Sequence, residues 1–64
     1  MRKLKKMRTN KGYTQKQLSE YSGISIRVIQ DYEQGHLYIN NAKADSLRSI
    51  AKVLECHIED LLEE

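Results

Sequence analysis

Residues 13 to 35 read YTQKQLSEYSGISIRVIQDYEQG, and this stretch carries the strongest structural signal in the chain. Thr14 with Gln17 three residues later is a capping-box pattern, which marks the first turn of a helix. Gly23 ends that helix, because glycine is common just past a helix end. Ser25 caps a second helix, which closes at the last glycine of the stretch. The pattern therefore predicts two helices of about eight residues joined by a short turn.

The spacing of the apolar residues indicates how these two helices pack. Four side chains can meet between them as a wedge: Leu18, Ile24, Ile29 and Tyr32. Ser19 is small enough to let the second helix cross close over the turn. This layout is that of a helix-turn-helix. An ordinary pair of antiparallel helices would not require all of these residue types at these positions. We therefore favour DNA binding over the simpler αα-hairpin.

The rest of the chain predicts three more helices. We expect a first helix over residues 2–11, a fourth from 43 or 44 to 54, and a short fifth that carries Ile58, Leu61 and Leu62. Residues 36–42 read as a loop anchored by Leu37 and Ile39. The fold class expected is all-α, with five short helices in one domain over residues 1–64.

Composition narrows the function classes. The single cysteine excludes an internal disulfide, and no apolar run approaches the roughly 20 residues that span a bilayer. No apolar signal core follows the basic N-terminus, so the expected compartment is the cytoplasm. The net charge is only +2, but residues 1–16 contain seven basic side chains and no acid, whereas residues 36–64 contain six acids and three bases. A basic end and an acidic end suggest a polyanion on one side, or simply a solvated gradient of charge.

Residues 13–35 resemble the Cro/repressor-type helix-turn-helix family, also called the XRE family. The resemblance covers nearly the whole chain. Outside that stretch, these residues carry it: Leu4, Arg8, Leu47, Ile50, Ala51, Leu54, Ile58, Leu61 and Leu62. It implies a five-helix lambda-repressor-like DNA-binding domain without an appended effector or peptidase domain. The expected function is a sequence-specific transcriptional regulator, most simply a repressor, that binds double-stranded DNA as a homodimer.

The second helix of the pair is expected to read bases in the major groove. Its N-terminal part enters the groove in such domains, and its outward stripe is polar. The candidate base-contacting residues are Ser25, Ile26, Arg27, Gln30 and Asp31. Arg27 can donate two bonds to guanine, and Gln30 can read adenine. Ile26 either contacts a thymine methyl or packs on a neighbouring side chain, and Asp31 either accepts from cytosine or orients Arg27.

Two segments are candidates for phosphate binding. The start of the first helix of the pair presents free N–H groups and the positive end of the helix dipole, and Gln15 and Lys16 stand there. The resemblance places Gln15 at a backbone-contact position. It also implies that the loop after the recognition helix touches phosphate, where this chain has Asn40, Asn41 and Lys43. The alternative for these three is an ordinary polar surface loop.

Arg8 and Glu33 both fall on apolar helix faces, where a charge needs a partner, so we expect them to form a structural ion pair.

Cys56, His57 and His36 lack the spacing of a zinc site, and His57 with Asp60 suits a local helix cap better. No catalytic constellation is evident, so neither an enzyme nor a cofactor is expected. Val53, Ile58, Leu61 and Leu62 either form a dimer surface or complete the core. The alternative function is an antitoxin-like or other protein-interaction module on the same scaffold.

Overall fold

The helix-turn-helix pair begins with a closed capping box. In the computed structural model, which describes residues 2–64, α2 spans Gln15–Ser22. The N–H of Gln17 donates to Oγ1 of Thr14 at 3.0 Å, and the N–H of Thr14 donates to Oε1 of Gln17 at 2.9 Å. Both bonds satisfy donors that would otherwise be unpaired at the helix start, so the local sequence alone fixes where α2 begins.

The turn after α2 depends on Gly23 and Ser19. Gly23 has φ of +76°, a left-handed conformation that costs other residues about 1–2 kcal/mol. The hydroxyl of Ser19 donates to the carbonyl of Ile24 at 2.6 Å. The small side chain of Ser19 therefore leaves room for the turn and also bonds to it. α3 then spans Ile26–Gln34, and Oγ of Ser25 accepts the N–H of Arg27 at 3.2 Å. The predicted bounds of α2 and α3 are confirmed.

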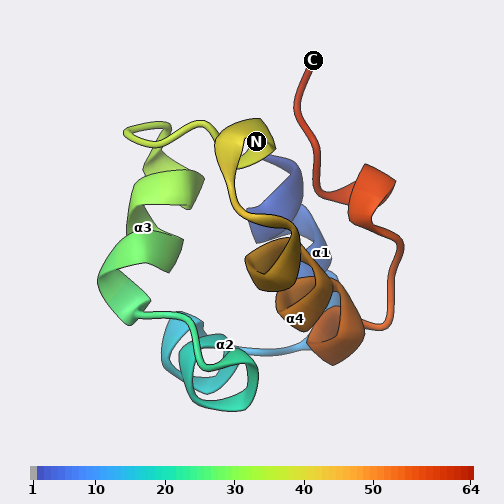
Figure 1. Cartoon of the computed structure of the whole chain (residues 1–64). Helices are drawn as coiled ribbons and strands as arrows, with labels where there is room; N and C mark the ends of the chain where they lie inside the picture. Colours follow the sequence, from blue (N-terminus) through green and yellow to red (C-terminus); the bar gives the residue numbers. More distant parts are fainter. Residues whose placement is uncertain (1) are drawn as a thin grey trace.

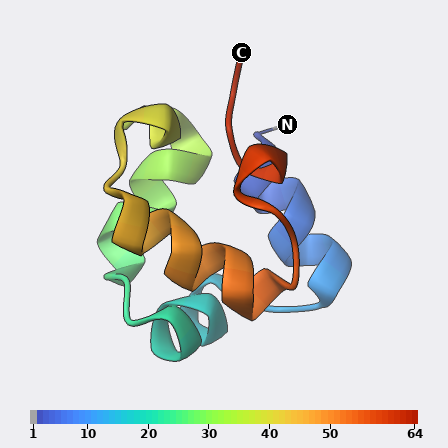
Figure 2. The same ribbon diagram turned by 45° about the vertical axis from the view of Figure 1, so that its right-hand side comes forward.

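α1 (Lys3–Lys11) and α4 (Ala44–Leu54) complete the helical framework. Figures 1 and 2 show α4 running through the middle, with α1, α2 and α3 around it. The buried apolar side chains come from all four α-helices and from two later segments: Leu4, Leu18, Ile29, Ile39, Leu47, Ile50, Ala51, Leu54 and Leu61. Leu18 and Ile29, on the two helices of the pair, are both 0% exposed. This shared core holds the pair at a fixed angle to the rest of the chain.

The fifth helix is shorter than the sequence predicts. Within residues 2–64 the structure has four α-helices, and the C-terminal segment forms only a one-turn 3₁₀ helix, η2 (Ile58–Asp60). His57 still provides the local start, since its N–H donates to Oδ2 of Asp60 at 3.0 Å. Leu61 follows directly and is 0% exposed, so this side chain completes the core and is not available to a dimer surface.

The loop after α3 also differs from the expectation. It contains a second 3₁₀ turn, η1 (Ile39–Asn41), which the sequence did not indicate. Ile39 anchors it with 3% exposure, as predicted, whereas Leu37 is 44% exposed and anchors nothing. The residues that precede Ile39 in the loop, 36–38, are exposed beside the end of α3 (Figure 1).

Candidate nucleic-acid interface

The first turn of α3 presents an exposed cationic side chain. Arg27 is 82% exposed, and its Nε lies 3.8 Å from Oδ1 of Asp31 one turn later. Ser25 and Ile26 are also exposed, with Ile26 at 39%. All three stand at the N-terminal end of α3, which is the part of such a helix that can enter a major groove.

Asp31 sits between two basic side chains. Besides Arg27, Nδ1 of His36 lies 3.4 Å from Oδ1 of Asp31, and the Asp31 side chain is 24% exposed. The backbone carbonyl of Asp31 also accepts the N–H groups of His36 at 2.8 Å and Leu37 at 3.2 Å. In this placement Asp31 can orient Arg27. Sequence reasoning considered His36 only as a metal ligand and missed this contact.

The start of α2 provides the expected N–H groups. The capping box uses the N–H of Gln17, which leaves those of Gln15 and Lys16 at the open end of the helix. The side chain of Lys16 is exposed, whereas that of Gln15 is half-buried. An anion at this end would meet backbone donors, the positive end of the dipole and one ammonium group.

The predicted ion pair between Arg8 and Glu33 is present and nearly buried. Nε of Arg8 donates to Oε2 of Glu33 at 2.7 Å, and Nη2 donates to Oε1 at 3.0 Å. Their side chains are 10% and 3% exposed. The remaining guanidinium nitrogen, Nη1, donates to the carbonyl of Tyr13 at 2.7 Å. A bidentate pair with a third bond satisfies most of the donors that burial removes from water, and it joins α1 to α3.

A chain of polar contacts continues from this pair to the outward face of α3. Nε2 of Gln15 donates to Oε1 of Glu33 at 3.0 Å, and Nε2 of Gln30 lies 3.4 Å from Oε1 of Gln15. A carboxylate only accepts, so Gln15 must turn its nitrogen to Glu33 and its oxygen to Gln30. Gln30 must in turn direct its nitrogen to Gln15. The amide of Gln30 is therefore held in one orientation, a feature that the spacing of residues alone did not reveal.

The three loop candidates separate into two kinds. Asn41 and Lys43 are exposed, and Lys43 forms no ion pair within residues 2–64. Asn40 is half-buried, and its amide bonds to Tyr38 and to the backbone of Glu63. Both N–H groups of the Asn40 amide already have partners, so a bond from Asn40 to phosphate would require one of them to be given up.

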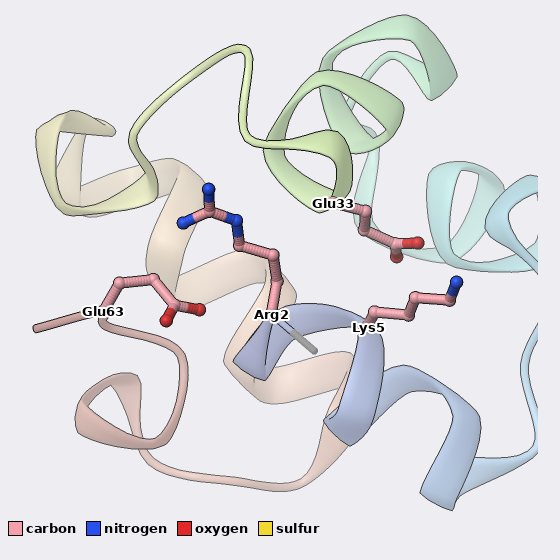
Figure 3. Close-up of a pocket in the computed structure, with 4 residues that line it drawn as sticks. All are labelled: Arg2, Lys5, Glu33 and Glu63. Atoms are coloured by element: carbon pink, nitrogen blue, oxygen red, sulfur yellow. The ribbon is translucent and has the colours of Figure 1, made fainter.

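A polar hollow lies between the start of α1, the end of α3 and the C-terminal segment. Its lining includes Arg2, Lys5, Glu33 and Glu63 (Figure 3). The guanidinium of Arg2 lies against Gly35, where a Cβ would meet Nη2 of Arg2. The hollow has carboxylates as well as cations, which distinguishes it from the basic start of α2.

The C-terminal cysteine and histidine stay apart from this face. Burial, and to a lesser degree the carboxylate of Asp60, raises the pKa of the Cys56 thiol. Within the described part of the chain, no three His, Cys, Asp or Glu side chains gather as metal ligands. None of the helices in residues 2–64 has both the length and the apolar character that a membrane crossing needs.

Comparison with known families agrees with this geometry. A family model described as "Helix-turn-helix" (HTH_3) matches residues 4–61, which includes all four α-helices except the first residue of α1. Searches of curated proteins and of solved structures found no match. The match extends over most of the sequence and includes the capped pair α2 and α3. The chain belongs to the helix-turn-helix family of DNA-binding domains, of the XRE type.

Proposed function

We propose that this protein is a sequence-specific transcriptional regulator that reads the major groove with α3. The observation that carries the proposal is the position of Arg27, 82% exposed on the first turn of the second helix of a helix-turn-helix. A guanidinium there can donate two hydrogen bonds to O6 and N7 of guanine. Gln30, with its amide held by Gln15, is proposed to read adenine.

The proposed phosphate contacts flank this reading helix. Gln15 and Lys16 lie at the start of α2, and Asn41 and Lys43 lie in the loop between α3 and α4. Lysine contacts to phosphate release counterions, so they strengthen binding to every sequence and make it depend on salt. Base contacts from α3 then add the preference for one sequence.

We further propose that the protein binds as a homodimer and acts as a repressor. Two copies of α3 would read half-sites with centres about 34 Å apart on a near-palindromic operator. Of the predicted dimer residues, Val53, Ile58 and Leu62 remain candidates because they are only partly buried. Occupancy of an operator is enough to block access by other proteins. The proposal is a binding function in the cytoplasm, without catalysis, carried by the one domain in residues 1–64.

The test is selection of bound duplexes from a randomised pool, followed by footprinting. The proposal expects an enriched motif that occurs twice, in inverted orientation, with the spacing given above. Absence of any enriched motif at about 50 mM salt, where phosphate binding is strong, would contradict it. A protein partner that covers Arg27, together with absence of DNA affinity, would instead favour the interaction-module alternative.

A further inference from the structure

The side-chain amide of Asn40 pairs with the backbone of Glu63, 23 residues later. Its Nδ2 donates to the carbonyl of Glu63 at 2.5 Å, and its Oδ1 accepts the N–H of Glu63 at 2.7 Å. One side chain thus holds both polar backbone groups of one residue. Bonds of this kind restrain the C-terminal segment, which would otherwise be free to fray.

The hydroxyl of Tyr38 closes the same cluster. Nδ2 of Asn40 donates to Oη of Tyr38 at 2.9 Å, and Oη lies 3.2 Å from the carbonyl of Glu63, to which it can donate. An amide nitrogen carries two hydrogens, and both are now assigned, one to each partner. We call Tyr38, Asn40 and Glu63 the latch. A phosphate oxygen could gain a bond from Asn40 only if the latch lost one.

The latch also reaches α1 through the Glu63 side chain. The N–H of Lys3, the first residue of α1, donates to Oε2 of Glu63 at 2.7 Å. A carboxylate at a helix start satisfies an unpaired donor and complements the positive end of the dipole. Figure 3 shows this carboxylate directed toward the start of α1, beside Arg2. Since Arg8 of α1 is bonded to Glu33 of α3, the loop, the C-terminal segment and both helices form one connected unit.

We propose that Asn40 is a positioning residue for DNA binding and not a phosphate contact. By holding Glu63, it fixes η1, and thereby Asn41, against the framework that also carries the reading helix. This inference rests on the proposed function, because it gives the loop between α3 and α4 a role in phosphate binding. It assigns the acidic C-terminal segment a supporting role, although its charge alone would oppose DNA.

Two substitutions separate positioning from contact. Asn40→Ala removes the amide, and Glu63→Pro removes the N–H and the carboxylate while it leaves Asn40 in place. Positioning predicts that both weaken binding to a selected duplex, by about five- to tenfold for the loss of roughly one net hydrogen bond. Glu64→Ala is the matched control, since it removes the same negative charge from the neighbouring exposed residue. It should leave binding unchanged or slightly tighter.

A direct phosphate contact predicts the opposite sign for one variant. Glu63→Pro removes the bond to Oδ1 of Asn40 and so loosens the amide, although the carbonyl of residue 63 stays. A phosphate contact by Asn40 would then make this variant bind as tightly as Glu64→Ala or more tightly. That result would overturn the inference. Tyr38→Phe provides a milder variant that keeps the ring, and positioning predicts a smaller loss in the same direction.

Hydrogen exchange without DNA tests the latch itself. In Asn40→Ala, the backbone amides of Glu63 and Lys3 should exchange about tenfold faster, whereas those of the α4 core should not change. Unchanged exchange at both amides would overturn the latch. A wild-type chain that binds no duplex would contradict the proposed function, whereas wild-type binding with Asn40→Ala unaffected would contradict only the positioning role.

Discussion

Oε1 of Glu33 accepts the side-chain N–H of Gln15 at 3.0 Å, which joins a buried ion pair to the start of the helix proposed to bind phosphate. The two residues are 18 positions apart and belong to α3 and α2. Since Glu33 only accepts, it fixes which way the Gln15 amide faces. The buried carboxylate of Glu33 thereby orients the amide of Gln15 and, through it, that of Gln30.

Gln15→Ala should relax base preference at the position read by Gln30, although Gln15 itself touches no base in the proposal. Without its partner, the Gln30 amide can turn either way, and part of the roughly 1–3 kcal/mol of discrimination expected from a bidentate contact is lost. Selection of bound duplexes measures this directly. Preference at the base pair read by Arg27 should stay the same, and equal loss at every position would contradict the orienting role.

Arg27→Ala and Lys16→Ala should differ in kind. Arg27→Ala should cost about 1–3 kcal/mol and relax preference at one base pair. Lys16→Ala should weaken binding to all duplexes alike and reduce the slope of log K against log salt by about 0.9. Titrations of specific and nonspecific duplexes at several salt concentrations measure both effects. Identical behaviour of the two variants would show that the assigned roles are wrong.

Arg8→Ala should lower the free energy of unfolding by about 3–5 kcal/mol, because it leaves the Glu33 carboxylate buried without its charged partner. In a domain of this size that loss approaches the whole stability. Replacement of both residues by apolar ones, Arg8→Met with Glu33→Leu, should recover much of it. Urea unfolding of the single and double variants measures the difference. A double variant as unstable as Arg8→Ala would contradict this account.

Features set by near neighbours in sequence were predictable. The capping box at Thr14 and the caps of α3 follow from residues two to four positions apart. The Arg8 and Glu33 pair was predictable for a different reason, since two charges on apolar faces of neighbouring helices have few alternatives.

Contacts between distant residues that both lie in polar stretches were not predictable. Asn40 and Glu63 stand in polar stretches that read as ordinary surface, and nothing in either stretch points to the other. The fifth helix failed for a related reason. Its apolar residues had helical spacing, but a segment so short gains little from helix formation, and the packing of Leu61 is satisfied by a single 3₁₀ turn.

Cys56 should react slowly with iodoacetamide near neutral pH. Burial and the Asp60 carboxylate raise the pKa of the thiol, so less of the reactive thiolate is present at a given pH in the folded chain than in the unfolded one. The rate should rise toward the unfolded value only at alkaline pH. Because the pKa of this thiol is higher in the folded chain, its contribution to the free energy of unfolding falls as pH rises past the pKa of the thiol in the unfolded chain. Mass spectrometry of timed samples, with and without urea, measures both rates. A folded thiol that reacts as fast as the unfolded one at pH 8 would contradict this prediction.

Glu55 ends α4 in a conformation that suits glycine better. Its φ is +54° and its ψ is +46°, the one left-handed non-glycine residue in the described chain. That conformation costs about 1–2 kcal/mol for a residue with a Cβ. Glu55 does form an ion pair with Lys11, but its side chain is 70% exposed, and exposed pairs contribute at most about 1 kcal/mol.

Glu55→Gly should therefore keep the free energy of unfolding or raise it by up to about 1 kcal/mol, after the greater chain entropy of unfolded glycine is subtracted. Glu55→Val should lower it by more than 1 kcal/mol, because a β-branched side chain tolerates this region least. Lys11→Ala isolates the ion pair, and it should change stability by no more than about 1 kcal/mol. Thermal and urea unfolding rank the four proteins. If Glu55→Gly is clearly less stable than the wild type while Lys11→Ala is unaffected, Glu55 contributes something at the end of α4 beyond its backbone conformation and its pair with Lys11.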